Sequence, residues 1–201
     1  MPGSWLQPLS LEGRHVRLEP LGLHHLEELQ EAVSDGDLWN LWYTPIASPS
    51  GMAAEIQRRL DLQARGLWLP FTMREPRTGR VAGMTAYLNG EEEHRRLEIG
   101  GTWVRRSLQR TALNTEAKRL LLAHAFEALD CIAVELRTSF YNHASRRAIE
   151  RLGAHLDGIL RHHRRTHGHL RDTCVYSIVA PEWPTVRTHL DHLLEVGGSG
   201  R

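Results

Sequence analysis

Residues 95–104, R-R-L-E-I-G-G-T-W-V, decide the predicted fold, because they alternate as a strand does and lead directly into a helix. Strict alternation places Leu97, Ile99, Gly101 and Trp103 on one face, and Glu98, Gly100, Thr102 and Val104 on the other. After residues 105–111, R-R-S-L-Q-R-T, an apolar helical pattern runs from about 112 to 129. A strand followed by a well-covered helix predicts a domain in which helices pack against a sheet.

The segments on either side continue this mixture of strands and helices. We expect strands at 14–19, 67–74, 80–88 and 132–138, helices at 23–33, 51–65, 143–152 and 183–195, and a hairpin at 155–178. Some strands are joined by hairpins and others by helices, so antiparallel and parallel neighbours are both expected. The prediction is an α/β protein of the α+β type. Its mixed, mostly antiparallel sheet has about seven strands, with helices on both faces.

Composition limits the class of protein. The 201 residues favour a single domain over 1–201, with 1–10 as an N-terminal arm and 196–201 as a flexible tail. The 25 basic and 24 acidic residues nearly balance, which argues against nucleic-acid binding. No stretch resembles a membrane span or a signal peptide, so we expect no membrane partner and a cytoplasmic location. Cys131 and Cys174 form no C-x-x-C pair and are expected to be free thiols.

The junction at residues 105–111 is a candidate anion site. A helix N-terminus presents unpaired N–H groups and a partial positive charge, and Arg105, Arg106 and Arg110 add full charges. Gly100 and Gly101 weaken the preceding strand unless a bulge forms or a ligand comes close. The alternative is an ordinary strand-to-helix loop with solvated arginines.

Five segments in order resemble the GNAT superfamily of acyl-CoA N-acyltransferases, most closely its RimJ/RimL-type branch. They are L-E-G-R-H-V-R-L-E-P at 11–20, G-T-W-V at 101–104, L-N-T-E-A-K at 113–118, N-x-x-S-x-x-x-I-E-x-L-G-A at 142–154, and R-D-T-C-V-Y-S-I at 171–178, followed by E-W-P. The resemblance covers about residues 11–184. It implies a GNAT-like fold that binds acetyl-CoA where two central strands diverge. It also implies acetyl transfer to a primary amine, either a protein N-terminus or a small molecule, by direct attack in a ternary complex.

The resemblance also implies which residues hold the CoA. The predicted set is Thr102, Trp103, Val104, Gln109, Arg110, Thr111, Ala112, Leu113, Asn114, Thr115, Asn142, Ser145 and Arg146. Backbone near 102–104 would pair with the pantetheine arm, and the amides of 109–115 would hold the pyrophosphate. The superfamily pattern Gln/Arg-x-x-Gly-x-Gly/Ala departs here, because Ala112 and Asn114 replace the two small residues. Ala112 supplies the same amide if its φ is negative, and Arg110 can add a charge-assisted contact.

Two residues are candidates for proton transfer. Glu98 is the predicted base, acting directly or through a water, with a salt-bridged or solvated strand carboxylate as the alternative. Many superfamily members have a tyrosine acid where this chain has Ile149, so the resemblance indicates Ser145 instead. Ser145 can equally be a hydrogen-bonding partner of CoA. Asn142 would contact the pantetheine amides, or serve only as a helix cap.

Aromatic residues are candidates for the wall of the acceptor site, as an alternative to plain core packing. The predicted wall residues are Trp39, Trp42, Tyr43, Tyr87 and Tyr141, and Trp68 is a further candidate. Four histidines between 162 and 169 have no accompanying carboxylate or cysteine at a ligand spacing, so no metal is expected. A homodimer is compatible with the sequence. The rival functions are a non-catalytic acyl-CoA-binding module and an acyltransferase for a larger donor such as succinyl-CoA.

Lys118 is the only lysine beside 24 arginines. Coding bias is the simple explanation. A second explanation is that arginine in place of lysine protects the surface from stray self-acetylation, because the guanidinium group stays protonated and does not react. Its position one turn into the predicted helix places it near the expected pyrophosphate end.

Overall fold

The computed structural model describes the backbone of residues 5–198 and the side chains of residues 5–196. In this part of the chain, one eight-stranded sheet has the order β1-β2-β3-β4-β5-β6-β8-β7. The strands are β1 Leu11–Glu12, β2 Arg17–Pro20, β3 Trp68–Arg74, β4 Val81–Glu91, β5 Arg96–Val104, β6 Ala133–Ser139, β7 His155–Thr166 and β8 His169–Val179. Only β5 and β6 are parallel neighbours in this sheet. The predicted mixed sheet is confirmed, and the strand beyond the expected seven is β1, which is too short to show an alternation.

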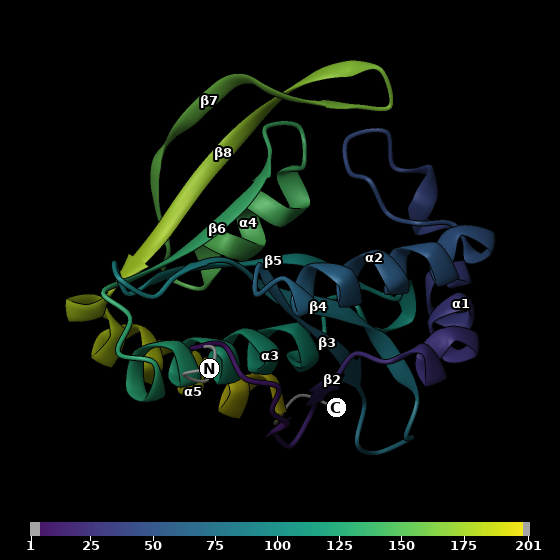
Figure 1. Ribbon diagram of the computed structural model, residues 1–201. Helices are drawn as coiled ribbons and strands as arrows, with labels where there is room; N and C mark the ends of the chain where they lie inside the picture. Colours follow the sequence, from purple (N-terminus) through teal and green to yellow (C-terminus); the bar gives the residue numbers. More distant parts are fainter. Residues whose placement is uncertain (1–4, 199–201) are drawn as a thin grey trace.

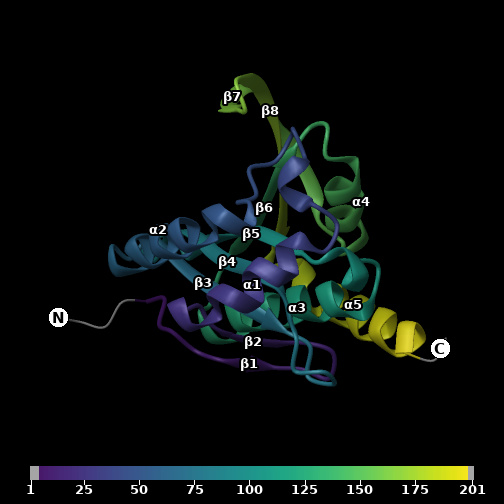
Figure 2. The ribbon, with the colours of Figure 1, turned by 90° about the vertical axis from the view of Figure 1, so that its right-hand side faces the viewer.

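The helices lie on both faces of the sheet (Figures 1 and 2). They are α1 Leu26–Ser34, α2 Met52–Ala64, α3 Ala112–Ala123, α4 His143–Arg151 and α5 Trp183–Gly198. Helix α5 includes residues 196–198, which were expected to belong to a flexible tail. Residues 199–201 of that tail and 1–4 of the arm lie outside the described part. None of the helices within 5–198 is long and apolar enough to cross a membrane.

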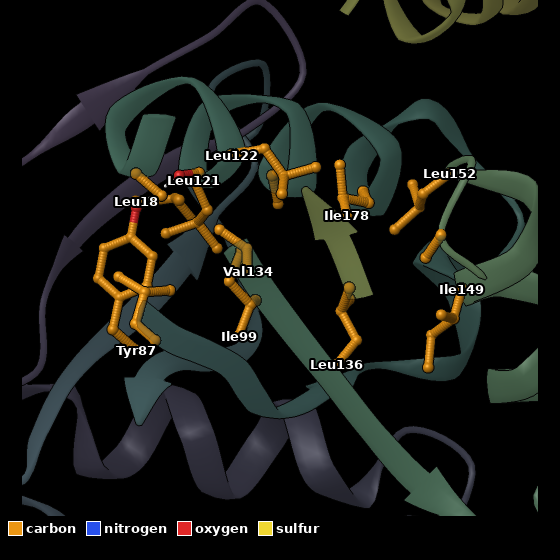
Figure 3. Close-up of a cluster of buried hydrophobic side chains, with 14 of the residues drawn as sticks. Leu18, Tyr87, Ile99, Leu121, Leu122, Val134, Leu136, Ile149, Leu152 and Ile178 are labelled. Atoms are coloured by element: carbon orange, nitrogen blue, oxygen red, sulfur yellow. Dashed lines mark hydrogen bonds between the residues drawn. The ribbon is translucent and has the colours of Figure 1, made fainter. Parts of the chain in front are cut away.

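Two clusters of buried side chains hold the layers together. The larger cluster packs α3, α4 and α5 against one face, with Leu121, Ile149 and Leu190 as helix members. Figure 3 shows Leu121 and Ile149 pointing into this cluster. The smaller cluster packs α1 and α2 against the other face, with Leu29 and Ile56 among its members. Since burial of apolar surface is the main favourable term in folding, these clusters fix the sheet between its helices.

Strand β5 changes faces partway along. Leu97, Ile99 and Val104 belong to the larger cluster, whereas Trp103 belongs to the smaller one. Gly101 has a φ of 59°, and the register with β4 shifts between Met84 and Ala86. The prediction that Trp103 shares a face with Leu97 and Ile99 is therefore wrong. A bulge at the two glycines inserts one extra residue and exchanges the faces that follow it.

The helix predicted for 112–129 is interrupted by a wider turn. Helix α3 ends at Ala123, and residues His124–Ala128 continue as a π-helix. The Tyr87 hydroxyl donates to the carbonyl of Leu121 at 2.6 Å, and Figure 3 shows the Tyr87 ring standing between the sheet and α3. The same carbonyl also accepts the N–H of His124, so it has both a backbone and a side-chain donor where the π-helix begins.

Candidate active site

Strands β5 and β6 are paired over only three residues each. Residues 96–98 pair with 133–135, after which β5 stays with β4 and β6 stays with β8. The facing edges of 99–104 and 136–139 therefore have no strand partner. Their polar backbone groups can bind another extended molecule, as sheet edges do. Glu98 is the last residue of β5 that pairs with β6, so it lies at the apex of this divergence. Figure 1 shows the two strands running apart.

The N-terminus of α3 follows this open edge. Thr111 caps it, because its hydroxyl accepts from Leu113 N at 3.3 Å. Ala112 begins the helix and is not one of the residues with positive φ, so its amide points outward as a glycine's would. Arg110 has a φ of 61°, and Gln109 Nε2 donates to Val104 O at 2.8 Å. The replacement of glycine by Ala112 therefore leaves the backbone donors in place.

The L-N-T-E-A-K segment has mainly structural contacts. Leu113 is buried in the larger cluster, and Thr115 accepts from Arg151 Nη2 at 2.7 Å, which joins α3 to α4. The Glu116 carboxylate accepts backbone N–H groups of residues 14–16. Asn114 lies in the first turn, with its Oδ1 buried and without a donor. Of this segment, only the first turn faces the predicted pyrophosphate.

Two buried basic side chains contact the β5 bulge from opposite faces. Lys118 Nζ donates to Thr102 Oγ1 at 2.7 Å and to Thr85 Oγ1 at 3.3 Å. Arg59 Nη2 donates to Gly101 O at 3.2 Å from α2. Burial lowers the pKa of Lys118 to about 7. Lys118 therefore lies under the bulge, and not at the pyrophosphate end as its sequence position had indicated.

Glu98 is a buried carboxylate with few partners. Its side chain accepts from Asn89 Nδ2 at 2.9 Å, and Arg137 Nε lies 3.6 Å from its Oε2. Burial raises the pKa of Glu98 above its ordinary value, although Arg137 and Asn89 act in the opposite direction. A carboxylate with a raised pKa is a stronger base. The position of Glu98 at the apex fits the predicted base. Its long contact with Arg137 fits the alternative, a salt-bridged strand carboxylate.

Helix α4 presents its first turn to the same opening. Asn142 caps it, since its Oδ1 accepts from Ser145 N at 3.0 Å. Ser145 is half-buried one turn into the helix. Arg146 donates from Nε to the Tyr176 hydroxyl at 3.1 Å, so this predicted CoA ligand already has a protein partner. Ile149 is buried in the core, and its hydrocarbon side chain has no proton to donate.

The predicted acceptor wall is only partly assembled. Trp42, Tyr43 and Tyr141 line one small cavity together with residues of the β7–β8 hairpin. The Trp42 ring centroid is 5.4 Å from that of Tyr141. Tyr87 is fully buried under α3 and does not reach this wall, which corrects its assignment. Trp39 packs against the smaller cluster, and Trp68 lies under Arg58 and Arg59.

Sequence reasoning missed three arginines at this site. They are Arg59 on α2, Arg137 on β6 and Arg171 on β8. In a chain with 24 arginines, no local spacing distinguishes them from solvated ones. For Arg171 a signal was available, because it begins the R-D-T-C segment that resembles the family. That segment had served only to identify the family and not to assign a role to Arg171.

The histidine run lies on the exposed β7–β8 hairpin. His162 and His163 are in β7, His167 is in the turn and His169 begins β8. His163 Nδ1 contacts Thr173 Oγ1 at 3.1 Å. Among residues 5–196, no group of three histidine, cysteine or acidic side chains is placed to hold a metal ion.

Diverging parallel strands, a buried carboxylate at their apex and a capped helix N-terminus beside them thus lie close together in this fold. Residues 15–155 match the model of the acetyltransferase (GNAT) domain, and the chain belongs to this family.

Individual relatives agree with this assignment. YdaF of Bacillus subtilis, assigned as a ribosomal N-acetyltransferase, is 30% identical over 105 residues, which are 52% of this chain and 57% of YdaF. This match thus spans little more than half the length of the curated relative. A crystal structure from T. thermophilus, assigned as an acetyltransferase, is 36% identical with a TM-score of 0.82, covering 94% of this chain and 98% of the other. RimJ of Mycobacterium smegmatis, solved with CoA-disulfide, shares the fold at 21% identity with a TM-score of 0.76, covering 95% and 93%.

Proposed function

We propose that this protein transfers the acetyl group of acetyl-CoA to a primary amine, in a complex that holds both substrates at once. The observation that carries the proposal is the end of β5–β6 pairing at Glu98, because it leaves an unpaired backbone edge and a buried base at one point. The first turns of α3 and α4 flank the same opening and supply capped helix N-termini for the phosphates and amides of CoA. The CoA-bound RimJ structure supports CoA as the carrier.

Each step of the reaction has a candidate group. Glu98, directly or through a water, takes a proton from the ammonium form of the acceptor. The neutral nitrogen then attacks the thioester carbonyl, and backbone N–H groups near Trp103 or Val104 stabilise the oxyanion. As the C–S bond breaks, the attacking nitrogen releases its second proton to solvent and the new amide forms. The CoA thiolate takes a proton from solvent, or from Ser145, which then regains one from solvent. Ser145 suits this role because its helix turn faces the opening and Ile149 cannot donate.

The acceptor class follows from the amine chemistry and from the curated relative. An α-amine has a pKa of about 7.7 to 8.0 and is partly neutral at pH 7, whereas a lysine amine at about 10.4 is not. YdaF is assigned to ribosomal-protein acetylation, which favours a protein N-terminus as acceptor. A small-molecule amine is the alternative acceptor.

Thiol release from acetyl-CoA, followed across a panel of peptide N-termini and small amines, tests the proposal. We expect release that depends on the amine, together with acetyl-CoA binding in calorimetry. Binding without release for any amine would favour a non-catalytic module. Faster release from succinyl-CoA would identify a larger donor. A protein that binds no CoA would overturn the proposal.

A further inference from the structure

The open sheet face around Glu98 carries more positive than negative charge. Glu135, which pairs with Glu98 across β5 and β6, is already bound by Arg96 at 2.8 Å and by Arg137 at 2.7 Å. Beyond them, Arg164 on β7 and Arg171 on β8 stand directly opposite each other. Within the described residues, neither of these two arginines forms a salt bridge. Glu98 acts on both arginines electrostatically, but no carboxylate of the described residues is in salt-bridge contact with either.

Arg171 is the member of the pair that is partly removed from water. Its Nε is buried and has no hydrogen-bond acceptor. Burial lowers the pKa of Arg171, the charge of Arg164 lowers it further, and Glu98 acts in the opposite direction. A buried guanidinium N–H without an acceptor costs free energy that a carboxylate can recover, because guanidinium binds carboxylates with two parallel hydrogen bonds.

The position of Arg171 connects this charge to the acceptor side of the site. It lines the same cavity as Trp42, Tyr43, Tyr141 and His169, and it interacts electrostatically with Glu98. The cavity has a volume of about 10 Å³, which is room for about one water molecule. Trp42 and Tyr141 are 50% and 53% exposed, so their rotation can open it to a larger group.

We propose that Arg171, with Arg164 beside it, binds an anionic group of the acceptor, so that favoured acceptors are amines that also carry a carboxylate. The inference rests on the proposed acetyl transfer and specifies its substrate. Glu98 receives the amine end and Arg171 receives the anionic end, and both lie on the face opposite α3. Two sources supply this chemistry: the α-carboxylate of a free amino acid, or an Asp or Glu side chain near a protein N-terminus.

Matched acceptors test the inference by thiol release from acetyl-CoA. One arm compares serine with serinamide, and the other compares Ser-Asp and Ser-Asn peptides that are amidated at their C-termini. We expect kcat/KM to be about tenfold or more higher for the anionic member of at least one pair, mainly through KM. The pair that shows the preference identifies the source. Equal values in both pairs would overturn the inference.

Two variants distinguish a specific contact with Arg171 from a general attraction of anionic acceptors to the positively charged hairpin. Arg171→Met should abolish the preference while the protein still binds acetyl-CoA, whereas Arg165→Met, an exposed charge on the same hairpin, should retain it. A preference that survives in Arg171→Met also overturns the inference. If release occurs with neutral amines but without preference, only this inference fails. If no amine supports release, the proposed acetyl transfer fails.

Discussion

The proposed CoA side of the site and its proposed acceptor side are built in different ways. The CoA side consists of β5, β6, and the first turns of α3 and α4, whose contacts are largely local, such as Thr111 to Leu113 and Asn142 to Ser145. The acceptor side joins Trp42 to Tyr141 and His169, which lie in a distant part of the sequence. The CoA side thus has caps and paired strands to hold it, whereas the acceptor side depends on exposed rings and on a hairpin. We expect the first to determine the reaction and the second to determine the acceptor.

The largest expected effect is on the CoA side. Glu98→Gln should lower kcat by about 10²- to 10⁴-fold, because a positioned base is lost, with little change in the KM for acetyl-CoA. The wild-type acid limb of kcat/KM should reflect the pKa of Glu98, raised above its ordinary value by burial, and the variant should lack this limb. Glu135→Gln is the matched control, since it pairs with Glu98 but is bound by two arginines. Unchanged turnover in Glu98→Gln would remove this residue from the mechanism.

Lys118 gives a large effect on stability that depends on pH. Its pKa is lowered to about 7 in the folded state, so between pH 7 and its ordinary value of 10.5 the unfolded chain binds more protons. The free energy of unfolding therefore rises with pH in this window, by up to about 1.4 kcal/mol per pH unit. Urea unfolding of wild type and Lys118→Met at several pH values measures this contribution as the difference in slope. If the free energy of unfolding changed with pH equally in the two proteins, the Lys118 side chain would not be held as the neutral amine in the folded state.

The bulge should respond to a single methyl group. Gly101→Ala places a Cβ at a φ of 59°, 3.3 Å from Arg59 Nη1, and should cost about 1–2 kcal/mol of unfolding free energy together with turnover. Gly168→Ala is the control, because this glycine has a φ of 80° with nothing within 4 Å of its Cβ. The control should lose stability but retain turnover. If both variants lost turnover equally, the conformation of the bulge at Gly101 would have no specific role in the reaction.

The smallest effect on stability belongs to the acceptor side. Trp42→Ala should change the free energy of unfolding by less than about 0.5 kcal/mol, since the ring is half exposed. It should nevertheless raise the acceptor KM and leave acetyl-CoA binding unchanged. Steady-state kinetics with each substrate varied in turn give this comparison. A weaker affinity for acetyl-CoA would show that the two sides are not independent.

The sequence predicted most of the regular elements, because their patterns are local. Helix α4 begins at the predicted cap Asn142, and α3 begins at Ala112 as expected. The periodic pattern did not predict the π-helix after Ala123, and the hydroxyl that bonds Leu121 O beside it comes from Tyr87, on a strand 34 residues away. The same hydroxyl explains why Tyr87 was wrongly placed in the acceptor wall: its polar group has a partner inside the core.

The sequence by itself determined the succession of strands and helices, the capped helix starts, and the family to which the motifs belong. These rest on periodicity and on contacts between near neighbours, which the order of residues specifies directly. Only the tertiary structure decided that β5 exchanges faces at Gly101, that Lys118 and Arg59 hold this bulge, and that Arg171 reaches the aromatic cavity. These contacts join elements far apart in the chain, and the burial that raises the pKa of Glu98 and lowers that of Lys118 exists only once they pack together.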